Sequence, residues 1–170
     1  IPHGRLTVVI GPNGAGKSTL LRALAGLLTP LSGRLMVDDR PIAALGVTAR
    51  ARAIAFVAQE RIVHWPLPVR TLVGLGRLPH RAAGAAETAA DARAIDAALA
   101  PMDVTHLTAR AADQVSGGEL ARVLIARALA QEPRALIADE PAAGLDPAHQ
   151  LSLFRHLREI ANKGVTVIVA

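Results

Sequence analysis

The sequence predicts an α/β fold in which a parallel sheet carries an inserted helical subdomain. Near both ends of the 170-residue chain, short apolar runs rich in Val, Ile and Leu alternate with segments of helical periodicity. Between these two parts, residues 65–132 are rich in alanine and are predicted to form helices. Strands that alternate with helices are typical of a parallel sheet, because each crossover between parallel strands needs a long connection.

The first part of the chain contains three predicted strands and one helix. Bounding glycines and β-branched residues favour strands over Leu6–Ile10, Leu35–Val37 and Ile54–Val57. Leucines at helical spacing predict a helix over Ser18–Leu28, and Asp38–Asp39 is predicted to form a turn.

The later part continues the same alternation. Helices are predicted over Glu87–Ala100, Leu120–Gln131 and Pro147–Lys163, and strands over Ala135–Ala138 and Val165–Ala170. We therefore assign residues 1–64 and 133–170 to an α/β core and residues 65–132 to a helical subdomain. Because strands are predicted almost at both termini, where polar segments are usual, we interpret the chain as truncated at both ends.

The composition narrows the possible functions. Cysteine is absent, which excludes disulfides and thiolate metal sites. The net charge of +5 arises from arginines scattered among alanines rather than from a basic run, so no nucleic-acid partner is predicted. No apolar run approaches the roughly 18 residues of a membrane span.

A phosphate-binding loop is predicted between the first strand and the first helix. The pattern G-x-x-x-x-G-K-[ST] is matched by Gly11, Pro12, Asn13, Gly14, Ala15, Gly16, Lys17 and Ser18. Glycines let the backbone N–H groups surround an anion, and the helix N-terminus adds partial positive charge. Lys17 is then expected to reach the β- and γ-phosphates, Ser18 to bind Mg²⁺, and Thr19 to make a further phosphate contact.

Two carboxylates follow the strand Ala135–Ala138. Parallel strands end at the same edge of a sheet, so Asp139 and Glu140 are expected beside the phosphate loop. Asp139 is suited to hold Mg²⁺ directly or through water, and Glu140 to polarise an attacking water.

A third motif, Ser-Gly-Gly-Glu, precedes the helix Leu120–Gln131. Its residues are Ser116, Gly117, Gly118 and Glu119, and a serine with two glycines at a helix start is suited to bind an anion. The chain contains this motif together with GPNGAGKST, Gln59 after a strand, ALIADEP and the AGLD of Ala143–Asp146. In the order and spacing of these five motifs, the sequence resembles the nucleotide-binding domains of the ABC family.

The resemblance implies a P-loop NTPase (RecA-like) core that binds ATP and Mg²⁺ and pairs head to tail with a second ATPase domain. Gln59 would sense Mg²⁺ and water and would also link the core to the helical subdomain. Ser116 and Gly118 would contact the γ-phosphate of the partner's ATP, with Gly117 and Glu119 beside them. Asp146 would couple the two sites.

The chain also departs from the family pattern. The family's signature motif corresponds here to Val115–Glu119, and it usually opens with leucine where this chain has Val115. Ala143 replaces the usual serine of the loop before Asp146. The family's switch histidine and adenine-stacking aromatic fall outside this sequence.

The stretch Pro66–His80 resembles ATPases of bacterial importers for iron chelates, haem and cobalamin. That branch implies a permease partner, a periplasmic binding protein and a place on the cytoplasmic face of the plasma membrane. Within the stretch, Leu72 and Leu75 are expected to be buried, and Arg77 and His80 to be exposed towards the permease. Soluble ABC ATPases, exporters and binding-only homologues remain as alternatives, although Lys17, Asp139 and Glu140 argue against the last.

Overall fold

The computed structural model describes residues 1–61, 63 and 65–170, so the predicted core boundary at residue 64 lies outside the described residues. Four parallel strands form the central sheet in the order β1 (Leu6–Val8), β6 (Thr166–Val169), β5 (Ala135–Ala138) and β4 (Ile54–Val57). The carboxyl ends of all four strands therefore lie at the same edge of the sheet. The predicted α/β fold with a parallel sheet is confirmed.

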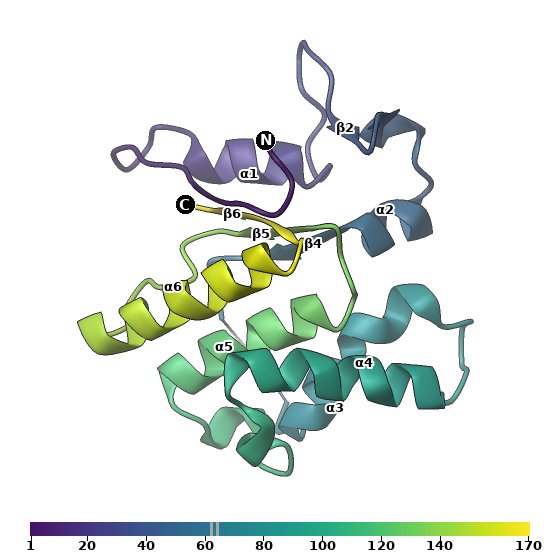
Figure 1. Ribbon diagram of the computed structural model, residues 1–170, viewed down its shortest axis with the longest axis vertical. Helices are drawn as coiled ribbons and strands as arrows, with labels where there is room; N and C mark the ends of the chain where they lie inside the picture. The colour runs from purple at the N-terminus through teal and green to yellow at the C-terminus, as the bar shows by residue number, and fades with distance from the viewer. Residues whose placement is uncertain (62, 64) are drawn as a thin grey trace.

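Helices cover both faces of the sheet, giving three layers (Figure 1). Alternate strand residues point to opposite faces. Ile54, Ile137 and Ile168 pack in one cluster with Leu21 of α1 (Lys17–Leu24). Their neighbours along the strands pack in a second cluster with α5 (Gly117–Leu129) and α6 (Pro147–Asn162); these neighbours are Ala55, Leu136 and Val167. Burial on both faces explains why the strands are continuous apolar runs.

Helices α3 (Val69–Gly74) and α4 (Ala89–Leu99) pack on α5 and on each other, beyond the sheet (Figure 1). The remaining helical elements are α2 (Val47–Ala53), η1 (Ile42–Ala44), η2 (Leu75–His80), η3 (Ala100–Met102), η4 (Thr105–Leu107) and η5 (Ala112–Gln114). None of the helices in the described part of the chain is long and apolar enough to cross a bilayer.

The element bounds follow the predictions with local differences. β4 and β5 match the predicted ranges, whereas α1 ends at Leu24 because Gly26 adopts a left-handed φ of 70°. The predicted turn Asp38–Asp39 joins β2 (Met36–Val37) to β3 (Arg40–Pro41), with φ values of 48° and 59°. Two positive φ values in a two-residue loop are the signature of a type I′ hairpin. Helix α2 was not predicted.

The prediction that Arg77 is exposed is wrong. Its side chain is only 5% exposed, and its Nε donates to Asp91 Oδ1 at 2.9 Å. Its Nη1 donates to the carbonyl oxygen of Ala130 at 2.7 Å and to Glu132 Oε2 at 2.6 Å. The Arg77 guanidinium holds the pKa of the Asp91 carboxyl well below its usual range.

The helix type also changes within this stretch. From Leu75 the chain winds as a 3₁₀ helix with about three residues per turn, so residues three apart share a face. Leu75 and Leu78 face solvent at 39% and 61% exposure, and Arg77 turns inward. Leu72 is buried as predicted, Leu75 is not, and half-buried His80 lies with Nε2 2.9 Å from the carbonyl oxygen of Gln131.

Replacement of Arg77 by glutamate should therefore destabilise the fold. The change places a carboxylate against Asp91 and removes the partner of a buried charge, which costs about 3–5 kcal/mol of unfolding free energy. Denaturant unfolding of the full-length protein measures this loss. The matched control, Arg93→Glu on the exposed side of α4, should stay within about 0.5 kcal/mol. Equal stability of the two variants would contradict the buried ion pair.

Candidate functional site

The loop of residues 11–16 links β1 to the first turn of α1. Gly14 and Gly16 adopt φ values of 82° and 87°, which residues with a side chain rarely do, and Gly16 is the N-cap of α1. The Lys17 ammonium donates to the carbonyl oxygens of Gly11 at 3.0 Å and Pro12 at 3.2 Å. The loop is thus folded around its own cation at the positive end of a helix dipole, an arrangement suited to phosphate.

One hydrogen bond joins this loop to the end of β5. Ser18 Oγ donates to Asp139 Oδ1 at 3.1 Å, although the two residues are 121 positions apart in sequence. Asp139 is only 1% exposed, and its backbone N–H is held by the carbonyl oxygen of Val57 at 2.9 Å. The structure therefore brings the predicted hydroxyl and carboxylate together.

The two residues predicted to be catalytic also meet. Gln59 Nε2 donates to Glu140 Oε2 at 2.7 Å, across the ends of β4 and β5. Glu140 has a left-handed φ of 46°, which is uncommon for a residue with a side chain and aims its carboxylate away from the strand direction. A cleft of about 410 Å³ collects eight of the predicted site residues; it is lined by Asn13, Gly14, Gly16, Lys17, Ser18, Thr19, Gln59 and Glu140.

The oxygen ligands beside the loop fit a divalent cation of the Mg²⁺ type. Magnesium commonly takes one or two carboxylates, with water and substrate phosphates completing its octahedron. Within residues 1–61, 63 and 65–170 no group of three or more His, Asp or Glu side chains could hold a metal by itself. A hydroxyl and one buried carboxylate next to a phosphate loop match the first pattern.

The Ser-Gly-Gly-Glu segment forms the start of α5 but does not line the phosphate-loop cleft. Ser116 Oγ accepts from the N–H of Glu119 at 3.3 Å, and Glu119 Oε2 accepts from the N–H of Ser116 at 2.8 Å. This capping box lowers the pKa of Glu119, chiefly through the bond from the Ser116 backbone. Gly117 opens the helix, and a Cβ there would meet no other heavy atom of the described residues within 4 Å.

Asp146 is the N-cap of α6. Its Oδ1 accepts from the N–H groups of Ala148 at 3.0 Å and His149 at 3.1 Å, and its Oδ2 contacts the His149 ring. That ring contact is the main cause of the lowered pKa of Asp146. The same ring lies against Gly118, where a Cβ would be 3.2 Å from His149 Cδ2. His149 thus links Asp146 to the signature, a contact that the sequence did not predict.

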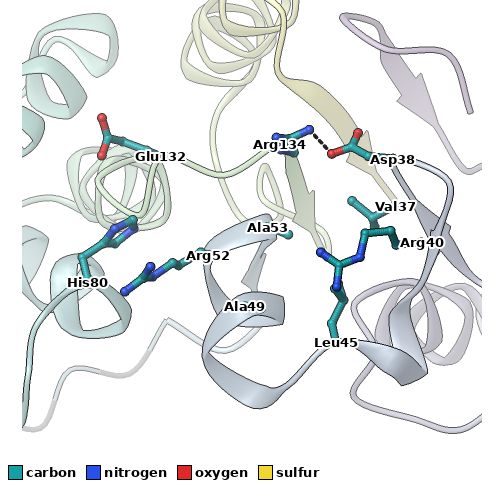
Figure 2. Close-up of a pocket in the computed structure, with 10 residues that line it drawn as sticks. All are labelled: Val37, Asp38, Arg40, Leu45, Ala49, Arg52, Ala53, His80, Glu132 and Arg134. Atoms are coloured by element: carbon teal, nitrogen blue, oxygen red, sulfur yellow. Dashed lines mark hydrogen bonds and ion pairs between the residues drawn. The ribbon is translucent and has the colours of Figure 1, made fainter.

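A second cleft, of about 500 Å³, lies at the opposite edge of the sheet (Figure 2). Ala53 and Arg134 line it, and they directly precede β4 and β5. Arg134 pairs there with Asp38 of the hairpin, as the dashed line shows. Ligand sites of parallel sheets lie at the carboxyl ends of the strands, so the phosphate-loop cleft remains the candidate site.

Arg61, beside the site, is a further residue whose contacts the sequence did not predict. Its Nη2 lies within hydrogen-bond distance of the carbonyl oxygens of Glu140, Pro141 and Ala143. The available signal was a long cationic side chain two positions beyond Gln59, at the exit of a strand whose end carries the site.

Known proteins resemble this chain in sequence and structure. Residues 1–143 match the family described as ABC transporter. The chain is 43% identical over 170 residues to the cobalamin import ATP-binding protein of Halobacterium salinarum, covering all of this chain and 42% of that protein. It is 43% identical over 169 residues to the hemin import ATP-binding protein of Nocardia farcinica, covering 99% of this chain and 58% of that one.

A solved metal-chelate type ABC transporter in an inward-facing conformation superposes with a TM-score of 0.86 at 32% identity, covering 99% of this chain and 62% of that chain. The chain therefore spans less than two thirds of the length of each of these proteins.

Replacement of Lys17 by alanine should weaken ATP binding about 10- to 100-fold, because a charge-assisted hydrogen bond is worth about 1.5–3 kcal/mol. Titration of a fluorescent ATP analogue into the full-length protein measures the Kd. The chain offers a matched control in its other lysine, exposed Lys163 at the end of α6, whose replacement should leave the Kd unchanged. A Lys17→Ala protein that keeps the original Kd would remove this loop from the nucleotide site.

Proposed function

This chain belongs to the ABC transporter family, and on that basis we propose that it binds and hydrolyses ATP to power import of a metal chelate or related cofactor. Cobalamin, haem and iron chelates are the substrate classes that agree with the relatives' names and with the stretch Pro66–His80. ATP binding follows from the family itself, and the geometry of the cleft supports the hydrolytic roles that we propose for its residues.

The observation that carries the proposal is two hydrogen bonds at the same edge of the sheet. The first joins Ser18 to Asp139 and offers hard oxygen ligands next to the phosphate loop. The second joins Gln59 to Glu140 and places a carboxylate in the same cleft. Phosphoryl transfer needs these three provisions together: a phosphate cradle, a metal site and a group that orients water.

The phosphate loop and Lys17 would bind the β- and γ-phosphates. The Lys17 ammonium has three N–H groups, and its two carbonyl bonds hold it at the mouth of the loop. The backbone N–H groups of residues 13–16 and the N-terminus of α1 add to the positive potential there.

Mg²⁺ would be held by Ser18 Oγ and, directly or through water, by Asp139. Bound there, the cation would neutralise charge on the phosphates during transfer. Asp139 Oδ1 accepts from Ser18 Oγ at 3.1 Å, so the two oxygen atoms lie close enough together to bind one cation.

Glu140 would act as the general base for the attacking water, and Gln59 would hold its carboxylate in the cleft. The Gln59 amide donates to one carboxylate oxygen, which leaves the second oxygen of Glu140 able to accept a proton from water. The left-handed backbone at Glu140 fixes the direction in which the side chain leaves the strand.

The signature would act on the nucleotide of a second ATPase domain paired head to tail. Ser116 and Gly118 lie at the positive N-terminus of the 13-residue helix α5, and the signature does not line this chain's own phosphate-loop cleft. Asp146, which contacts His149 beside Gly118, would relay between the two sites.

In this proposal residues 65–132 form a helical subdomain that receives a membrane permease. The exposed leucines Leu75 and Leu78, rather than buried Arg77, are then the residues that would contact the permease. The protein would then sit peripherally on the cytoplasmic face of the plasma membrane and work with a periplasmic binding protein. A soluble ABC ATPase is the alternative, and co-purification with a permease would distinguish the two.

Replacement of Glu140 by glutamine should lower ATP turnover by about 10²–10⁴-fold, the usual contribution of a general base. ATP binding should persist, because the phosphate loop is unchanged. Steady-state phosphate release and size-exclusion chromatography with ATP and Mg²⁺ measure turnover and the closed dimer. Exposed Glu159 of α6 provides the control, as Glu159→Gln should turn over normally. Full turnover by Glu140→Gln would refute the assignment of the base.

The Asp139→Asn change should raise the Mg²⁺ concentration for half-maximal ATP hydrolysis about 10- to 100-fold, the range found when groups around a metal are altered. Asparagine keeps the size and the Ser18 contact while removing the charge. The internal control is nucleotide affinity without Mg²⁺, which should not change. An unaltered Mg²⁺ dependence would place the metal elsewhere.

A further inference from the structure

Arg61 connects the segment that carries Gln59 with the loop that follows Glu140. Its Nη2 lies 2.8 Å from the carbonyl oxygen of Pro141 and 2.9 Å from that of Ala143, and 3.3 Å from that of Glu140. One guanidinium nitrogen has two N–H groups. The two shorter bonds are therefore the principal ones, and the carbonyl of Glu140 is a third, weaker acceptor.

The loop after Glu140 depends on such contacts, because it is not part of a helix or strand. It holds left-handed backbone at Glu140 and again at Gly144, where φ is 71°. Pro141 is buried, and a buried carbonyl needs a hydrogen-bond donor. Arg61 supplies that donor from a half-buried position. Burial lowers the pKa of Arg61, yet a guanidinium remains charged in proteins.

Gln59 and Arg61 bind the same loop at different points. Gln59 holds the carboxylate of Glu140, and Arg61 holds the backbone just beyond it. A displacement of residues 59–61 would therefore move the carboxylate and its supporting backbone together. Gln59 and Arg61 both follow β4, so the two contacts come from the exit of one strand.

We propose that Arg61 is a positioning residue for ATP hydrolysis, which ties the backbone after Glu140 to the segment of Gln59 and thereby holds the general base in place. The inference rests on the proposed function of Glu140. Arg61 acts through the loop and does not line the phosphate-loop cleft itself. It should therefore affect the rate of turnover and leave nucleotide binding nearly unchanged.

The test compares three variants of the full-length protein. Arg61→Met keeps a long apolar side chain without donors and should lower kcat about tenfold or more, because small misplacements of a catalytic group carry losses up to about 10²-fold. KM and the Kd for ATP should stay within about twofold. Arg61→Lys keeps a charged donor and should recover most of kcat. In the control, Arg52→Met removes a similar bond to a carbonyl, that of Pro79 at 2.9 Å, and should keep the original kcat.

Two results would overturn the inference. Unchanged kcat in Arg61→Met would show that the loop does not need this tie. A parallel loss of ATP affinity and thermal stability, with no recovery in Arg61→Lys, would mean that Arg61 only supports the fold. The Glu140→Gln protein distinguishes failure of the role of Arg61 from failure of the proposed function. If Glu140→Gln turns over ATP at the full rate, Glu140 is not the general base and the proposed function fails, whatever the Arg61 variants do.

Discussion

The hydrogen bond between Ser18 and Asp139 forms only because the parallel strands end at the same edge of the sheet. Ser18 lies in the first turn of α1, and Asp139 directly follows β5. They meet because β1, β6 and β5 run parallel and so end at one edge. A different strand direction would place Asp139 and the phosphate loop at opposite edges of the sheet. The parallel direction of the strands thus fixes the geometry of the site.

The edge is also where the backbone departs from regular geometry. Gly14 and Gly16 supply positive φ values without a steric cost, whereas Glu140 adopts one despite its side chain. Strain of this kind persists only where surrounding contacts determine the conformation. Gln59 and Arg61 supply such contacts, one at the carboxylate and one at the backbone beyond it. Rigidity near Glu140 therefore comes from a strand exit on the neighbouring β4.

Much of this arrangement could be predicted from the sequence. The phosphate loop, Asp139 and Glu140 were predictable because their spacing and strand context are local properties, and parallel topology then brings them together. Arg77 could not be placed in this way, because its buried partners are Asp91 on α4 and the carbonyl oxygen of Ala130 just beyond α5. Arg61 was missed for the same reason, since the carbonyl oxygens that it contacts lie 79 to 82 positions away in sequence. His149 was missed because its ring, besides contacting Asp146 three positions earlier, lies against Gly118 of α5.

A crystal structure of the full-length Glu140→Gln protein with ATP and Mg²⁺ tests the proposed site most directly. In that structure Mg²⁺ should be coordinated by Ser18 Oγ and should face the Asp139 carboxylate. Lys17 should lie against the β- and γ-phosphates, and residue 140 should face the γ-phosphate. Nucleotide bound away from the phosphate loop, or a metal held without Ser18 and Asp139, would contradict the proposed site.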